Sequence, residues 1–251
     1  MEVTEKRWGL NAFTLKLMAM AFMLCDHLWA TVVPGSQWLT CIGRLAFPIF
    51  AFQIVEGYFH TSDFRKYVRR MFLFALVSEI PYNLMTEGGI FNPFGQNVMF
   101  TFWISLLLLG LLEKARKQKT WVYLISAGLI CLLGYVVGTV SFVDYHGSGV
   151  LMVLLFYFCR GRKWGPLALI AGMLYINTEL IGGLMFELTL AGRSFFVYQQ
   201  AFAVLALIPI FLYNGRQGPH SRAIQMGCYL FYPLHMLVLA LIWLYVIVGR
   251  A

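Results

Sequence analysis

The first apolar stretch, from Ala12 to about Val32, carries three residues that could do chemistry: Lys16, Asp26 and His27. A titratable group inside a bilayer costs several kcal/mol unless it is paired or wetted, so such residues mark candidate sites and pathways. His27 follows Lys16 by eleven positions, which in a helix makes three turns plus roughly 20°. Both side chains are therefore expected on one helix face, separated by roughly 16 Å along the axis.

This arrangement suits acyl transfer, which needs a base, a group that orients the base, and a donor to the oxyanion. Histidine can take a proton near neutral pH and return it, so His27 is the candidate base. Asp26 points about 100° away from its neighbour His27, which makes Glu79 the better candidate to orient the imidazole. Lys16 would lie towards the phosphates of a cytoplasmic acyl donor. The candidate pocket and oxyanion donors are Arg44 together with Asn83 or Asn97.

Further polar residues lie at a similar level in other apolar stretches. Six or seven separate segments place polar side chains in one third of the expected membrane, which predicts that they face one another or a wet cavity. The additional candidate binding residues are Asp144, Glu179 and His235, and Gln199 and Gln200 lie at the same level. His235 follows Pro233, which frees a backbone carbonyl, so His235 could instead satisfy that local polar need.

Each of these residues also has a purely structural interpretation. Arg44 could pair with Glu79 or Asp26 and only tie helices together. Lys16 could pair with Glu56, which lies near it in level. His27 could be a hydrogen-bonded core histidine. The five cysteines show no CxxC or other metal spacing and are interpreted as small buried hydrophobes, so no metal site is expected.

The composition places the chain in the membrane class. Of its 251 residues 60% are hydrophobic and only 12% are charged, against about 25% charged residues in soluble domains. We expect an all-α, polytopic transmembrane helix bundle that forms a single integral-membrane domain over residues 1–251. The expected spans number about nine and cover 12–32, 39–59, 67–86, 97–113, 121–140, 147–160, 164–183, 197–213 and 224–248.

The basic residues predict the orientation and argue against nucleic acid as the partner of the +8 net charge. They occur before the first span and in every second loop, whereas the alternate loops 33–38, 87–96 and 141–146 contain no Lys or Arg. Lys6 and Arg7 precede the first span, which favours a cytoplasmic N-terminus.

Several stretches, in order along nearly the whole chain, resemble a known family. They include Leu10–Lys16, Asp26-His27, Gly43–Phe52, Glu56–Tyr58, Ser78–Asn83, Asn97–Thr101, Asp144-Tyr145, Gly149-Val150 and Phe231–His235. A basic residue, ten residues and then His is similar to the signature of the membrane-bound acyltransferase-3 superfamily. More specifically, the chain resembles the TraX family, named for the conjugation protein that N-acetylates F pilin. The resemblance implies a multi-pass acetyltransferase of the bacterial inner membrane that uses acetyl-CoA, with His27 as base and Lys16 towards the donor.

We therefore expect an acetyltransferase that moves an acetyl group from cytoplasmic acetyl-CoA to an amine or hydroxyl at the outer leaflet. The acceptor, whether peptide (such as a pilin-like N-terminus), glycan or small molecule, is not named by the sequence. A proton- or solute-coupled transporter would also explain a polar cavity, although no inverted repeat or matched pair of broken helices is visible. A non-catalytic assembly factor is the third alternative.

Overall fold

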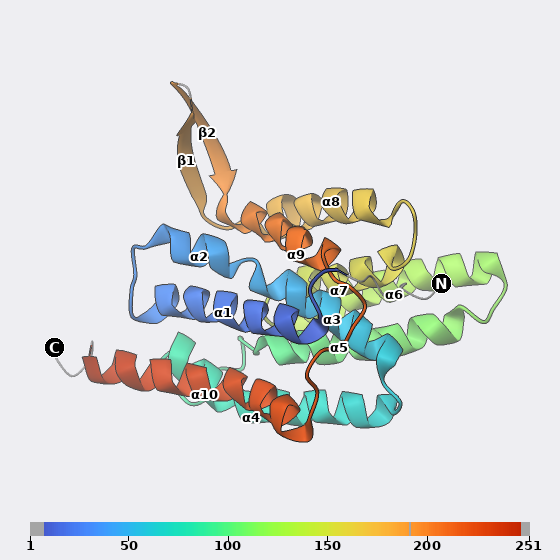
Figure 1. Ribbon diagram of the computed structural model, residues 1–251, viewed down its shortest axis with the longest axis horizontal. Coiled ribbons are helices and arrows are strands. Elements are labelled where there is room, and N and C mark those ends of the chain that lie inside the picture. Colours follow the sequence, from blue (N-terminus) through green and yellow to red (C-terminus); the bar gives the residue numbers. More distant parts are fainter. Residues whose placement is uncertain (1–7, 191, 247–251) are drawn as a thin grey trace.

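The computed structural model describes residues 8–190 and 192–246, so Lys6, Arg7 and the end of the last expected span lie outside the described residues. Helices dominate, and most of them run along the long axis of the molecule (Figure 1). The helices are α1 (Ala12–Thr31), α2 (Gln37–Gly43), α3 (Ala46–His60), α4 (Phe64–Thr86), α5 (Val98–Ala115), α6 (Thr120–Val140), α7 (His146–Cys159), α8 (Gly165–Tyr175), α9 (Leu207–Phe211) and α10 (Arg222–Val246). A π-helix, η1 (Ile176–Ile181), follows α8, and a 3-10 helix, η2 (Gln199–Ala206), precedes α9.

The expected all-α membrane fold is confirmed, but the count of nine spans is not. Within the described residues, five segments are long and apolar enough to cross a membrane: Ala12–Thr31, Gln37–His60, Val98–Ala115, Thr120–Val140 and Arg222–Val246. Three further apolar segments are shorter, namely His146–Cys159, Gly165–Ile181 and Gln199–Phe211. The seventh and eighth expected spans are thus built from short or irregular helical pieces.

The second expected span is broken at Arg44 and Leu45, between α2 and α3. Pro48 explains the position of this break. Proline has no N–H to donate to the carbonyl four residues earlier, which is that of Arg44, and its ring would clash with that carbonyl in a continuous helix. Pro48 is instead the third residue of α3, where a missing N–H costs nothing. The break places Arg44 between two helices.

A β-hairpin interrupts the helical fold where the sequence predicts a loop and the start of the eighth span. Strand β1 (Met185–Leu190) pairs antiparallel with β2 (Arg193–Tyr198), with Met185 opposite Tyr198. The hairpin projects from the bundle beside α8 and α9 (Figure 1). Aromatic and β-branched residues on both sides of Gly192 could have predicted it.

Helix ends and packing position the site. Side chains of Asn11, Asp63 and Asn97 accept hydrogen bonds from backbone N–H groups in the first turns of α1, α4 and α5. Helix α10 packs against α4 and α1, although it lies far from both in sequence. The loops after α3, α5 and α7 lie towards one end of the bundle in Figure 1, which we call the basic end because these loops hold the Lys and Arg clusters.

Candidate functional site

The candidate base, His27 of α1, contacts His235 of α10. The Nδ1 atom of His27 lies 2.7 Å from the Nε2 atom of His235. The two ring planes are within 5° of each other and the ring centres are 4.9 Å apart. The separation of the centres exceeds that of the nitrogens by about two ring radii, so the rings meet edge to edge through these nitrogens. The structure thus brings together two residues that the sequence predicts as separate candidates.

Asp26, the neighbour of His27, is held by Arg44. Arg44 Nη2 donates to both carboxylate oxygens of Asp26, at 2.7 and 3.0 Å, and Thr40 Oγ1 donates to Oδ1 at 2.7 Å. Gly43 allows this approach of α2 to α1, because a Cβ atom at Gly43 would collide with the side chain and backbone of Asp26. The Arg44–Asp26 pair of the structural interpretation is therefore present, and the Asp26 carboxylate is bound by Arg44 and Thr40.

A polar network continues from this pair into the irregular helices. Gln199 Nε2 donates to Thr40 Oγ1, Arg44 Nη1 lies 3.4 Å from Gln200 Oε1, and Gln200 Nε2 donates to Asn177 Oδ1 at 3.0 Å. Asn177 lies in the π-helix η1 and is fully buried. Asn177 was not among the residues predicted from the sequence, although it is an amide inside an expected span, the same signal that marks Asn83.

A cavity opens beside these residues, which we call the histidine cavity. Its polar wall includes Asp26, His27, Arg44, Tyr82, Asp144 and Tyr232. Tyr145 also lines it and stacks on Phe47, with ring centres 4.2 Å apart. Tyr145 and His146 both have positive φ angles, 60° and 49°, in the turn that starts α7. Such angles are uncommon for residues other than glycine and are held by surrounding contacts, frequently at functional sites.

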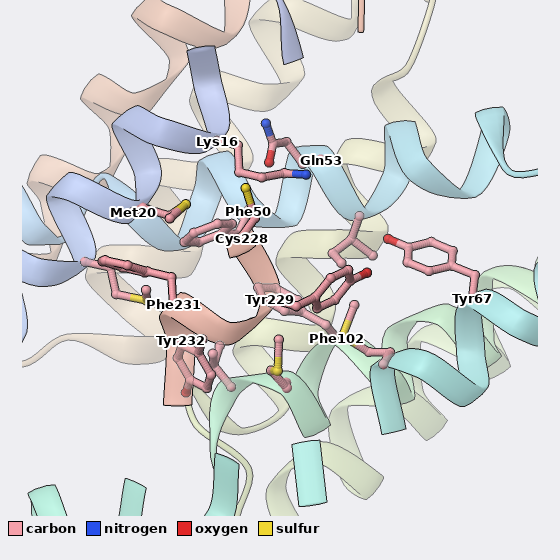
Figure 2. Close-up of a pocket in the computed structure, with 15 residues that line it drawn as sticks. Lys16, Met20, Phe50, Gln53, Tyr67, Phe102, Cys228, Tyr229, Phe231 and Tyr232 are labelled. Carbon is pink, nitrogen blue, oxygen red and sulfur yellow. The ribbon is translucent and has the colours of Figure 1, made fainter. Parts of the chain in front are cut away.

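Two further cavities lead from the histidine cavity towards the basic end. The central cavity shares Met23, Phe50, Val98, Phe102 and Tyr232 with the histidine cavity. The basic-end cavity shares Lys16, Gln53 and Cys228 with the central cavity and also touches His60 and His220. In Figure 2 the side chain of Lys16 reaches into the central cavity near Gln53. The Lys16 and His27 side chains thus border one series of adjoining cavities.

Lys16 does not pair with Glu56, so this structural interpretation is wrong. Glu56 is only 6% exposed, and its carboxylate accepts from Arg160 Nε at 2.6 Å and from Nη2 at 3.3 Å. Among the described residues, no carboxylate forms an ion pair with Lys16. Both residues line the basic-end cavity, but the Glu56 carboxylate is bound by Arg160, which directly follows α7. Lys16 keeps a half-buried ammonium beside the cavities.

The expectation that Glu79 orients His27 is corrected by its contacts. The Glu79 carboxylate accepts hydrogen bonds from the backbone and side chain of Asn97 and lies 3.5 Å from Asn83 Nδ2. Asn97 also donates to the carbonyl of Ala75, at 2.8 Å. Neither Asn83 nor Asn97 lines the histidine cavity, and the Asn97 amide is engaged in joining α4 to the start of α5. These three residues stabilise the junction of α4 and α5.

Of the remaining predicted residues, Asp144 lies in the wall of the histidine cavity and Glu179 does not. Asp144 lines the histidine cavity, and its Oδ1 accepts from the backbone N–H of Tyr145 at 3.0 Å. Burial raises the pKa of Asp144, which lies in the loop between α6 and α7, to about 6, against the opposing effect of Arg44. Glu179 is exposed and accepts from Thr178 of the same helix, so it is not part of the cavity wall. No cluster of the described residues has the ligands for a metal ion.

Comparison with known proteins identifies the family. The family model described as TraX protein matches residues 12–243. This chain belongs to the TraX family. The match extends over all the elements that build the three cavities, from α1 to α10.

A relative of the TraX-family chain is known from Dichelobacter nodosus, where it is described as a probable fimbrial assembly protein FimC of serogroup H1. The two sequences are 28% identical over 254 residues, which cover 91% of this chain and 94% of the relative. No solved structure matches this chain. The chain is therefore a TraX-family membrane protein that is similar, over nine-tenths of its length, to a protein described as a probable fimbrial assembly protein.

Proposed function

We propose that this protein is a membrane-embedded acetyltransferase that moves an acetyl group from cytoplasmic acetyl-CoA to an amine or hydroxyl acceptor at the opposite side of the membrane. The observation that carries the proposal is the series of three adjoining cavities between the basic end and His27. A simple structural bundle has no need of such a series, because membrane helices pack closely through small residues.

The walls of the series change in a way that suits acetyl-CoA. Lys16 lines the basic side of the series and can attract phosphates, since charge-assisted hydrogen bonds are strong. Arg70 lies near Lys16, behind the wall residue Tyr229, to whose hydroxyl its Nε donates at 3.1 Å. The central cavity is lined mainly by Met, Phe and Tyr side chains, which suit the long, weakly polar arm that carries the thioester. The arm would then present the acetyl carbonyl to the histidine cavity.

The chemistry follows from the residues of the histidine cavity. His27 takes a proton from the acceptor amine or hydroxyl as its nitrogen or oxygen attacks the thioester carbonyl. Arg44, whose buried Nε has no hydrogen-bond partner among the described residues, is the candidate donor to the oxyanion. The C–S bond then breaks, and His27 returns the proton to the departing thiolate. The similarity to a fimbrial assembly protein supports a pilin-like polypeptide as acceptor.

The direct test is release of coenzyme A from acetyl-CoA by the protein in nanodiscs, with wild type beside His27→Ala. The proposal expects slow release by the wild type, lowered at least ~100-fold in the variant, since general-base catalysis contributes about 10²–10⁴-fold. His146→Asn serves as the control, because His146 is exposed, outside the three cavities, and Asn tolerates its positive φ. Full activity of His27→Ala, or no acetyl-CoA binding by the wild type, would refute the proposal.

A further inference from the structure

The contacts of His235 determine which of its nitrogens carries the hydrogen. Its Nδ1 lies 2.7 Å from the carbonyl oxygen of Phe231, one turn earlier in α10. A carbonyl oxygen can only accept, so Nδ1 is the donor and carries the hydrogen. The other nitrogen, Nε2, faces His27 and bears a hydrogen only if the ring is a cation.

The surroundings of His235 favour the neutral ring. His235 is 8% exposed, the ring of Phe231 stacks on it with ring centres 4.7 Å apart, and the ring centre of Tyr232 lies 6.0 Å away. No described carboxylate forms an ion pair with His235. An unpaired cation at such a position would be costly, whereas a neutral imidazole satisfies both of its contacts. Its Nε2 is then a hydrogen-bond acceptor.

The tautomer of His27 follows from that of His235. If Nε2 of His235 accepts, Nδ1 of His27 must donate and therefore carries the hydrogen of the neutral His27 ring. The lone pair of His27 is then on Nε2. This nitrogen is the one that a base needs, because Nδ1 is already occupied by the contact with His235.

We infer that His235 is a positioning residue for the transfer reaction: it accepts a hydrogen bond from His27 Nδ1–H and so keeps Nε2 of His27 as the basic nitrogen. The inference deepens the proposed function and rests on it. When Nε2 takes the acceptor's proton, the His27 imidazolium keeps its bond to His235, and the same proton leaves from Nε2 to the thiolate sulfur. No proton is consumed, and His235 remains neutral throughout.

His235 acts through His27 rather than on the substrate. It does not line any of the three cavities that adjoin His27 and Lys16, whereas its neighbours Phe231 and Tyr232 line the central cavity. The ring is fixed on one side by the Phe231 carbonyl and on its face by the Phe231 ring. A residue buried behind the base, with one acceptor nitrogen directed at it, has the place that the carboxylate has in a Ser-His-Asp triad.

The first measurement is the ¹⁵N spectrum of histidine-labelled protein in nanodiscs without substrate. Long-range ¹⁵N–¹H correlations tell a protonated ring nitrogen from an unprotonated one, and the resonances of His27 are those missing from His27→Gln. The expected result at pH 7.5 is Nδ1–H with unprotonated Nε2 for both His27 and His235. A hydrogen on Nε2 of His27, or on both nitrogens of His235, would overturn the inference.

The second measurement compares His235→Phe, which removes the acceptor, with His235→Gln, whose amide oxygen can still accept. In His235→Phe, kcat should fall roughly 100-fold, within the range of general-base effects, and KM for acetyl-CoA should not change. In His235→Gln, kcat should stay within about tenfold of the wild-type value. Wild-type kcat in His235→Phe, or equal losses in two equally stable variants, would overturn the inference. Failure of the proposed function would give a different result: the wild-type protein would release no coenzyme A, whichever tautomer of His27 the spectrum shows.

Discussion

Arg44 donates hydrogen bonds from Nη2 to both carboxylate oxygens of Asp26, at 2.7 Å to Oδ1 and 3.0 Å to Oδ2. This pair joins α1 to the break between α2 and α3. Both side chains are about one-fifth exposed, at 19% and 20%. A pair so enclosed behaves differently from a surface ion pair, because removing one partner leaves the other charge desolvated.

Replacing Arg44 by Gln should therefore lower the free energy of unfolding by about 3 kcal/mol, the lower limit for breaking a buried pair, since this one is partly exposed. The double variant Asp26→Asn with Arg44→Gln should lose less than the sum of the single variants, because neither charge is then left alone. Denaturant unfolding in micelles measures all three. Arg116→Gln is the control, since the Arg116–Glu113 pair is exposed and such pairs contribute about 0–1 kcal/mol. Additive losses would show that the pair does not couple α1 to α2.

The helix that carries most of the polar residues could be predicted from the sequence, whereas most of their partners on other helices could not, the Arg44–Asp26 pair excepted. Helical spacing placed Lys16 and His27 on one face, and the structure has both bordering adjoining cavities. Spacing within one helix, however, says nothing of which neighbouring helix lies opposite that face. The contact of His27 with His235, which is 208 positions away, depends on how α10 packs against α1.

The predicted partners of Glu56 and Glu79 were wrong for the same reason, because the sequence does not show which helix each residue faces. Each has a depth that matches a plausible partner, Lys16 for Glu56 and His27 for Glu79, yet each faces another helix and pairs with Arg160 or Asn97. Breaks in helices were equally hard to predict from hydropathy, because the stretch around Arg44 is apolar on both sides. Pro48 marked that break, and its effect follows from the missing N–H alone.

Lys16 offers a test that separates binding from stability. Because its ammonium has no carboxylate partner among the described residues, Lys16→Met leaves no orphaned charge and should keep or raise the free energy of unfolding. Binding of acetyl-CoA should weaken roughly tenfold or more, since a hydrogen bond to a charged group contributes about 1.5–3 kcal/mol. Isothermal titration with acetyl-CoA and thermal unfolding measure the two effects.

Glu56→Gln is the matched comparison for Lys16→Met, because it removes one charge from the wall of the same basic-end cavity. That variant should unfold at a lower temperature, since Arg160 loses its carboxylate. Unchanged acetyl-CoA affinity in Lys16→Met would remove Lys16 from the proposed donor site. A loss of stability as large as that of Glu56→Gln would instead make Lys16 a structural residue.

The raised pKa of Asp144 predicts that the free energy of unfolding depends on pH. Its pKa is raised by burial from 3.8 to about 6, so the folded protein binds a proton between pH 4 and 6 that the unfolded chain has released. The contribution of Asp144 to the free energy of unfolding is therefore greatest below pH 4, falls as the pH rises from 4 to 6, and stays low above pH 6. A shift of two pKa units corresponds to about 3 kcal/mol, as an order of magnitude.

The prediction is checked by the difference in free energy of unfolding between wild type and Asp144→Asn, measured in micelles from pH 4 to pH 7.5. Other titrating groups affect both proteins alike and largely cancel in this difference. Asn cannot ionise, so the wild type should lose stability relative to Asp144→Asn as the pH rises, and the change should end near pH 6. A difference that is flat, or of opposite sign, would show that Arg44 offsets the burial of Asp144 and that the carboxylate is charged in the histidine cavity throughout this range.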